Sequence, residues 1–189
     1  SFLSFIICGC PFESKVPLAA APVEPVDSTL LGYWYGIVKD GSDFFGIEAL
    51  DITQQSDSTY AITRYGKAAK GDIILPDTSH FTGYISYAGE LRFMNVESSI
   101  VSVQTSRKKP PVVTTEKVYY FATFETRHDT LTMKTITENF PGAPRNGYRT
   151  PEEFKEAVLT LTGHQKNIYD DLYSLSYKKI PKPQPLKAF

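Results

Sequence analysis

Cysteine, histidine and tryptophan are scarce in this chain of 189 residues, which has two cysteines, three histidines and one tryptophan. The cysteines, Cys8 and Cys10, are so close in sequence that a disulfide between them would barely constrain the unfolded chain. The histidines, His80, His128 and His164, form no H-x-H or H-x-x-x-H pair. We therefore predict no zinc site, and we interpret each histidine as a surface or turn residue.

The sequence motifs of several enzyme classes are also missing. No serine has the flanking glycines of a G-x-S-x-G nucleophile elbow, and there is neither a P-loop nor a G-x-G-x-x-G sequence. A pair of carboxylates that catalyses glycoside hydrolysis is not excluded by the sequence, because such a role depends on the separation of the two groups in space. We interpret the candidates as residues of solvated strand faces: Glu48, Asp51, Glu90, Glu97 and Glu125. We predict that the protein is not an enzyme and has no catalytic residue and no cofactor.

Charge of one sign does not accumulate either, since the formal net charge is -1. A chain without a positive field is not predicted to bind nucleic acid. The basic cluster Arg107-Lys108-Lys109 is interpreted as a solvated loop that protects a sheet edge, with contact to anionic lipid headgroups as the alternative. Asp40, Ser42 and Asp43 lack the register of an EF-hand and are interpreted as a turn, so no metal is predicted.

The first ten residues are apolar, uncharged and too short to span a bilayer. They are typical of the end of a signal peptide, and residues 1–9 are interpreted as its remnant. Ile7-Cys8-Gly9-Cys10 resembles a lipobox, the processing motif of bacterial lipoproteins. The resemblance implies cleavage before Cys10, a diacylglycerol thioether on its sulfur and an acyl chain such as palmitate on its amine. Lipidation at Cys10 also leaves the exported chain without a free thiol.

Residues 10–28 contain several prolines and an alanine run, which interrupt any helix or strand pattern. We predict an extended tether between the lipidated cysteine and the folded domain, spanning roughly 50 Å. The alternative is an irregular strand packed along the domain, and it rests on Val16, Leu18, Val23 and Val26.

Short strand-like runs with close connections follow from residue 30, and aromatic residues at 13% also favour β structure. We predict eight or nine strands before residue 140 and assign them to an antiparallel barrel or sandwich within a domain of residues 29–180. The predicted runs cover residues 30–39, 44–53, 59–65, 73–75, 80–87, 90–96, 100–105, 117–126 and 131–137.

A helix is predicted over residues 151–162, packed on the sheet. Thr150 and Glu153 form a capping box with Pro151 at the first helical position, and the apolar face is set by helical spacing from Phe154 to Leu161. A short helical turn is expected over 168–172, then a last strand over 173–177. Residues 181–189 are predicted to form an extended basic tail.

Gly32-Tyr33-Trp34 resembles the G-x-W signature of lipocalins. The resemblance implies an eight-stranded barrel, with Trp34 closing one end and packed by a late basic residue. Arg127 and Lys178 are the candidates for that partner. The alternative is that Trp34 is an ordinary core aromatic residue.

Together these observations predict an exported, lipid-anchored protein of the bacterial envelope, with the outer membrane favoured. It is expected to bind a small apolar ligand or a protein partner. The alternatives are a structural or interaction lipoprotein with a core filled by side chains, and a surface inhibitor of a hydrolase.

Overall fold

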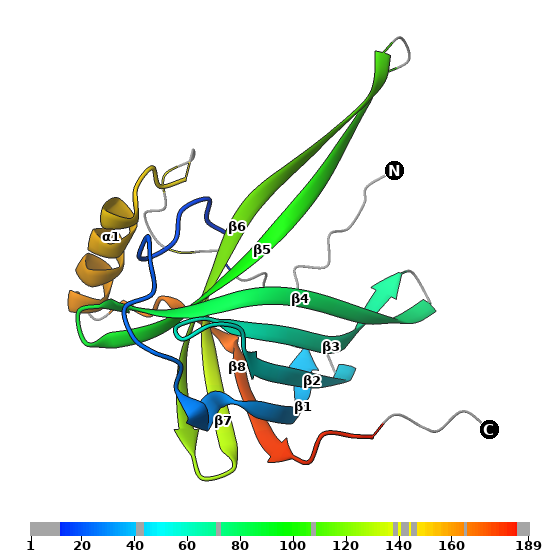
Figure 1. Ribbon diagram of the computed structural model, residues 1–189. Coiled ribbons are helices and arrows are strands. Elements are labelled where there is room, and N and C mark those ends of the chain that lie inside the picture. Colours follow the sequence, from blue (N-terminus) through cyan, green and yellow to red (C-terminus); the bar gives the residue numbers. More distant parts are fainter. Residues whose placement is uncertain are drawn as a thin grey trace.

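The computed structural model describes residues 12–40, 44–70, 73–106, 109–137, 140, 144, 147–164 and 166–184. Within these residues the chain forms a short 3-10 helix, eight strands and one α-helix (Figure 1). Their bounds are η1 (Ser28–Leu30), β1 (Gly32–Asp40), β2 (Phe44–Gln54), β3 (Tyr60–Lys70), β4 (Ile73–Ala88), β5 (Leu91–Ser106), β6 (Lys109–Arg127), β7 (Thr130–Ile136), α1 (Pro151–Gly163) and β8 (Tyr169–Ile180).

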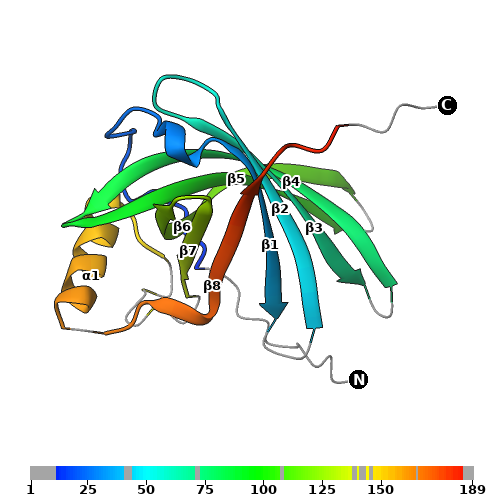
Figure 2. The ribbon, with the colours of Figure 1, turned by 90° about the horizontal axis from the view of Figure 1, so that it is seen from below.

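The strands form a closed antiparallel barrel in which each strand pairs with the next along the chain. Closure occurs between β1 and β8, where Gly36 lies opposite Tyr177, while Gly36 lies opposite Glu48 on β2. Figure 2 shows β8 and β1 side by side in the wall. The predicted antiparallel β fold is confirmed, and of the two predicted architectures it is the barrel.

The nine runs predicted before residue 140 form seven strands, β1 to β7, because the breaks inside two of these strands are only apparent. The runs 73–75 and 80–87 belong to β4, which continues through Pro76. Pro76 has no backbone N–H, but this half of β4 pairs only with β3, since the pairing with β5 covers Thr82 to Ala88. A proline is tolerated on such a free edge. The runs 90–96 and 100–105 likewise join in β5.

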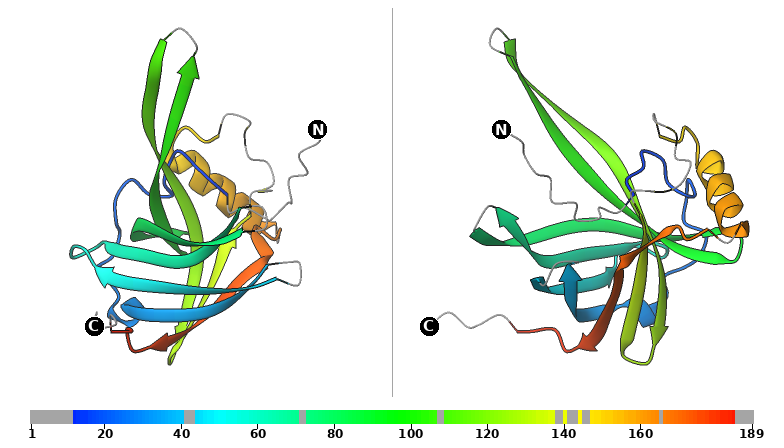
Figure 3. Two further views of the ribbon diagram at one scale, coloured as in Figure 1. Left: turned by 90° about the vertical axis from the view of Figure 1, so that its right-hand side faces the viewer. Right: turned by 180° about the vertical axis from the view of Figure 1, so that it is seen from behind.

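The distal halves of β5 and β6 leave the barrel as a two-stranded arm, defined as residues 98–106 and 109–118 (Figure 3). Neither neighbour follows them, because β4 pairs with β5 only as far as Glu97 and β7 pairs with β6 only from Ala122. Exposed apolar side chains lie on both faces of the arm, namely Ile100, Val101, Val103, Val112 and Val113. Of the basic cluster, Arg107 and Lys108 lie outside the described residues, and Lys109 begins β6.

The predicted helix is confirmed, and α1 packs on the outer wall of the barrel. The Thr150 hydroxyl accepts a hydrogen bond from the Glu153 amide at 3.2 Å, as the capping box requires. The Glu153 carboxylate accepts from the amide of Arg149, one residue earlier than predicted. Phe154 and Val158 are fully buried, because they face the barrel while the opposite side of the helix faces solvent.

The short helical turn predicted over residues 168–172 is wrong. Tyr169 already pairs with Ile136 as the first residue of β8, and the Thr137 amide donates to the Ile168 carbonyl at 3.0 Å. The end of β7 needs backbone partners, and this pairing supplies them. The predicted strand over 173–177 is part of the longer β8.

Residues 12–31, here called the strap, follow the alternative of a segment packed along the domain. The Phe12 amide donates to the Ile136 carbonyl, and Ser14 forms a backbone bridge with Tyr119, so the strap begins in the gap between β6 and β7. It then crosses β5 and β4, where Leu18 is buried. An extended tether over residues 12–28 is therefore wrong, and the folded unit includes these residues. Cys10 lies outside the described residues.

Two apolar clusters stabilise the fold, one outside the barrel wall and one inside it. The outer cluster lies under α1 and the strap and consists of Phe12, Leu18, Ala88, Phe93, Phe121, Ile136, Phe140, Tyr148, Phe154, Val158 and Ile168. The inner cluster consists of Leu30, Trp34, Leu50, Ile52, Tyr60, Ile62, Ile85, Met94, Leu131 and Tyr177. Alternate residues of β4 and β5 contribute to opposite clusters, as the strand period of two requires.

Candidate functional site

A cavity of about 810 Å³ lies inside the barrel and is the candidate functional site. Its lining is mainly apolar over most of its depth, with Leu50, Ile52, Ile62, Phe81, Met94, Val96, Phe124, Leu131, Met133 and Leu175 among the residues. Polar residues lie toward the end where β4 begins and the arm leaves the barrel, among them Ser79, His80, Ser98 and Ser99. The exposed position of His80 and Ser99 places the opening of the cavity at this end.

Trp34 closes the opposite end of the barrel. Its side chain is fully buried, and its indole N–H donates to the Leu30 carbonyl at 2.8 Å. The Lys179 ammonium lies 5.1 Å from the centre of a Trp34 ring, within the range of a cation–π contact. The basic partner is therefore Lys179, and neither predicted candidate holds this position. Lys178, the next residue along β8, is exposed and donates to Thr130 instead, because successive strand residues point to opposite faces.

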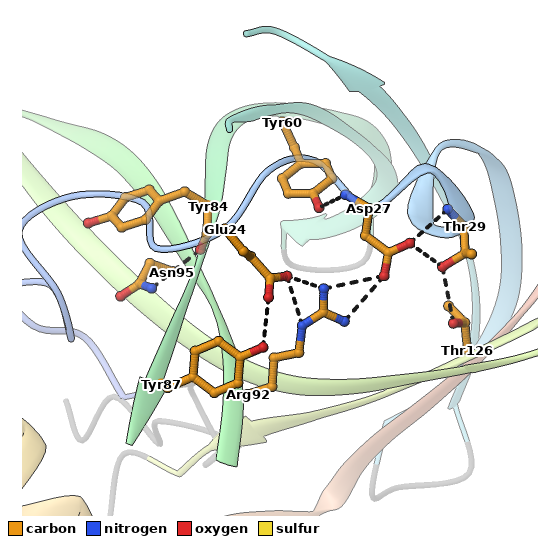
Figure 4. A network of polar contacts seen from close by, with 9 residues as sticks. All are labelled: Glu24, Asp27, Thr29, Tyr60, Tyr84, Tyr87, Arg92, Asn95 and Thr126. Atoms are coloured by element: carbon orange, nitrogen blue, oxygen red, sulfur yellow. Dashed lines mark hydrogen bonds and ion pairs between the residues drawn. The ribbon is translucent and has the colours of Figure 1, made fainter. Parts of the chain in front are cut away.

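The strap covers this closed end through a network of polar contacts (Figure 4). Arg92 of β5 is its centre: the guanidinium donates to the Glu24 carboxylate at 2.9 Å through Nε and to the Asp27 carboxylate at 3.3 Å. The Tyr87 hydroxyl donates to Glu24, and the Tyr60 hydroxyl accepts from the Asp27 amide at 2.7 Å. The strap is thereby fixed to three strands of the barrel, by its two carboxylates to β4 and β5 and by a backbone amide to β3.

The pKa of Asp27 reflects this position. Burial acts to raise it, but hydrogen bonds from Thr29 and Arg92, together with the charge of Arg92, outweigh burial and leave the pKa below its ordinary value of 3.8. Asp27 is therefore held in its charged form where it pairs with Arg92.

A chain of polar side chains crosses the cavity wall between the closed end and the opening, and we call Tyr177, Glu48, Arg64 and Asp77 the polar belt. Glu48 is 6% exposed and accepts from the Tyr177 hydroxyl at 2.6 Å and from Nε of Arg64 at 2.8 Å. Arg64 also donates to Asp77 through Nη1 at 3.3 Å. The expectation that Glu48 lies on a solvated strand face is wrong, because it points into the barrel.

Two glycines make room for the polar belt. Gly36 lies between Tyr177 and Glu48 in the sheet, and a β-carbon there would lie 2.7 Å from a carbon of the Tyr177 ring. Gly66 lies opposite Asp77, and a β-carbon there would lie 3.1 Å from Nη2 of Arg64. Each glycine thus lets a long side chain lie flat across the wall and reach a carboxylate. The Tyr177 and Arg64 side chains then face each other across Glu48.

Burial, and next the negative charge of Glu48 together with its hydrogen bond, raise the pKa of Tyr177 far above its usual range. The hydroxyl therefore stays protonated and acts as a donor to Glu48 at any physiological pH. With Arg64 on the other side, the buried carboxylate has one neutral and one charged donor.

The other candidate residues lie apart from the cavity or near its rim. His128 occupies a turn with φ of 54°, His164 caps the end of α1, and His80 is exposed on β4. The remaining carboxylates are distributed over the outer surface and its turns. Asp51 pairs with Lys182, Glu97 pairs with Lys117, Glu125 pairs with Arg127, and Glu90 lies in the turn between β4 and β5. Of the turn at Asp40, residues 41–43 lie outside the described part of the chain.

Within the part of the chain that the structure describes, no group of three or more histidine, cysteine or acidic side chains could hold a metal ion. The same residues include no helix of the length and apolar character needed to cross a membrane.

Comparison with known protein families, with curated proteins and with solved structures finds no match to this chain. We therefore infer the function of the protein from the geometry of its barrel.

Proposed function

We propose that this protein is an exported bacterial lipoprotein, without enzymatic activity, that binds a small apolar ligand inside its barrel. The cavity carries this proposal. Its volume of about 810 Å³ lies within the roughly 300 to 1,000 Å³ of small-molecule sites, which are usually apolar with a few fixed polar groups. Eight-stranded barrels of this size can hold one small ligand.

A protein partner is the second candidate, and the arm favours it. The side chains of Val101, Val103 and Val113 are each more than half exposed. Val103 and Val113 are direct cross-strand neighbours, so they form one apolar patch on one face of the arm. This patch is separate from the cavity, so the two candidate functions can be tested independently.

Binding of a neutral fluorescent probe such as N-phenylnaphthylamine to the purified full-length chain tests the ligand proposal. Val96 lines the cavity on β5, whereas Val101 is exposed on the same strand. Val96→Trp fills part of the cavity and should weaken probe binding by about tenfold or more, and Val101→Trp should leave binding unchanged within about twofold. Circular dichroism confirms that both variants are folded. Failure of the wild-type protein to bind any apolar probe would overturn the proposal.

The lipid anchor is tested in the full-length precursor by metabolic labelling with palmitate and by membrane fractionation. Cys10→Ser should abolish both the label and membrane partitioning, because the thioether needs the Cys10 sulfur. Cys8→Ser is the matched control and should be labelled and anchored as the wild type is. Labelling of the Cys10→Ser protein would show that the lipid is attached elsewhere or by another route.

A further inference from the structure

We infer that the ligand of the barrel is an amphiphile with a cationic head group, which binds at the polar belt while its apolar chain fills the deeper cavity. This inference rests on the proposed ligand-binding function and adds the chemical class of the ligand. It is carried by the charges of the cavity and by their positions along its depth.

Negative charge exceeds positive charge in and around the cavity. Glu48 and Glu13 are lining residues, and Asp77 is linked to Glu48 through Arg64. Among the described lining residues, Arg64 is the only arginine and there is no lysine. Arg64 is shared between Glu48 and Asp77, so two carboxylates lie beside one guanidinium. The polar belt therefore has a net charge of -1 when both carboxylates are ionised.

Because Glu48 is buried, its negative charge acts strongly on a ligand inside the cavity. Its side chain is 8% exposed, so water screens its charge far less than that of a surface carboxylate. Each carboxylate oxygen has two acceptor positions, and the contacts to Tyr177 and Arg64 occupy one on each oxygen. An ammonium group in the cavity can therefore add a charge-assisted contact without displacing either protein donor.

The rest of the lining fits the same ligand. Deeper than Glu48, toward the closed end, lie Leu50 and Ile52 of β2 and Ile62 of β3, which suit an alkyl chain. The aromatic residues Phe81, Tyr120 and Phe124 also line the cavity. Aromatic faces attract cations, including quaternary ammonium groups. The order along the barrel is thus an apolar floor, an acidic belt and a polar opening.

Displacement of the neutral probe by three ligands of equal chain length tests this inference on the wild-type full-length protein. The ligands are dodecylammonium, dodecanol and dodecanoate, each below its micellar concentration and at low salt. The ammonium compound should bind about tenfold more tightly than dodecanoate, with dodecanol between them. Raising the salt concentration should reduce the difference less than it would for exposed charges.

Glu48→Gln keeps the shape of the side chain and removes its charge. It should remove most of the preference for the ammonium compound and change dodecanol binding by no more than about threefold. Glu125→Gln, on the outer wall where Glu125 pairs with Arg127, is the control and should retain the full preference.

The outcomes separate this inference from the proposed function. Equal or tighter binding of dodecanoate by the wild type overturns the cationic ligand class and leaves the apolar cavity intact. No binding of any of the three, or of the probe, overturns the ligand-binding function itself. If Glu48→Gln does not fold, the wild-type series still decides between these results.

Discussion

The two apolar clusters of this protein differ in how completely side chains fill them. Aromatic rings dominate the outer cluster, where Phe154 lies 4.7 Å from Phe121, 4.9 Å from Tyr148 and 5.5 Å from Phe12, measured between ring centres. The inner cluster borders a cavity of about 810 Å³. Part of the apolar packing that stabilises this barrel therefore lies on its outside, under the helix and the strap. One wall separates this outer packing from the ligand space.

Phe154→Ala is the strongest test of this separation. Truncating a fully buried aromatic residue should lower the free energy of unfolding by about 3 to 5 kcal/mol, measured by urea denaturation. Because the cavity lies on the other side of the wall, binding of the neutral probe should stay unchanged in conditions where the variant is folded.

Leu159→Ala on the same helix is the control, since Leu159 is 40% exposed. It should cost less than about 1 kcal/mol. A similar loss for both variants would mean that the outer cluster contributes no more than the helix surface does.

Arg92→Met should have the next largest effect, because it leaves Glu24 and Asp27 close together without their shared cation. We expect the free energy of unfolding to fall by about 1 to 3 kcal/mol, between the values for exposed and buried ion pairs. The apolar part of the new side chain retains contact with Phe124, over whose ring the guanidinium lies at 4.8 Å.

The pH dependence of stability gives an independent check of the Arg92 network. The pKa of Asp27 is lower in the folded protein than its ordinary value of 3.8. The stability that Asp27 contributes is therefore present above pH 3.8 and is lost as the pH falls through the lower folded value. Arg92→Met should lose less stability than the wild type over this acidic interval. An equal loss would show that Arg92 does not hold the Asp27 carboxylate in its charged form.

Lys179→Met tests the closure of the barrel at Trp34. It should lower the free energy of unfolding by about 0.5 to 2 kcal/mol, the range of a cation–π contact. Because Trp34 is the only tryptophan, its fluorescence should also change. Lys178→Met is the control, since Lys178 faces outward from the same strand, and it should leave the tryptophan emission unaltered. An altered emission in both variants would count against the specific contact with Lys179.

The arm should contribute least to stability, because its valines belong to neither cluster. Replacing Val103 and Val113 by threonine should change the free energy of unfolding by less than about 0.5 kcal/mol and leave probe binding as it was. A larger loss would place the arm within the folding unit of the barrel.

Much of this fold could be predicted from local patterns. Alternation of apolar and polar residues indicates the strands, and Thr150 with Glu153 indicates where α1 begins. The closure of β1 on β8 could not be read in the same way, because pairing between the ends of a chain has no local marker. The prolines of the strap led to the wrong prediction of an extended tether. Prolines exclude regular structure but do not exclude packing against the barrel, and Leu18 of the strap is fully buried.

A pattern in the sequence does indicate the polar belt, although Glu48 was interpreted as a residue of a solvated strand face. Glu48 has the same strand parity as Leu50 and Ile52, and Arg64 has the same parity as Ile62. Opposite charges at apolar positions of two neighbouring strands indicate an ion pair inside the sheet. What no pattern could give is Tyr177, whose contact with Glu48 depends on barrel closure and on the absence of a side chain at Gly36.

The route of the strap gives the protein a defined response to mechanical force. Tension on the N-terminus first loads the hydrogen bonds of Phe12 and Ser14 in the gap between β6 and β7. If these fail, the strap peels away through Leu18 and Glu24 in turn, and only then does the load reach Leu30 above Trp34. Tension applied at the N-terminal end of the strap would therefore open the floor of the barrel last, after the preceding contacts of the strap have been broken.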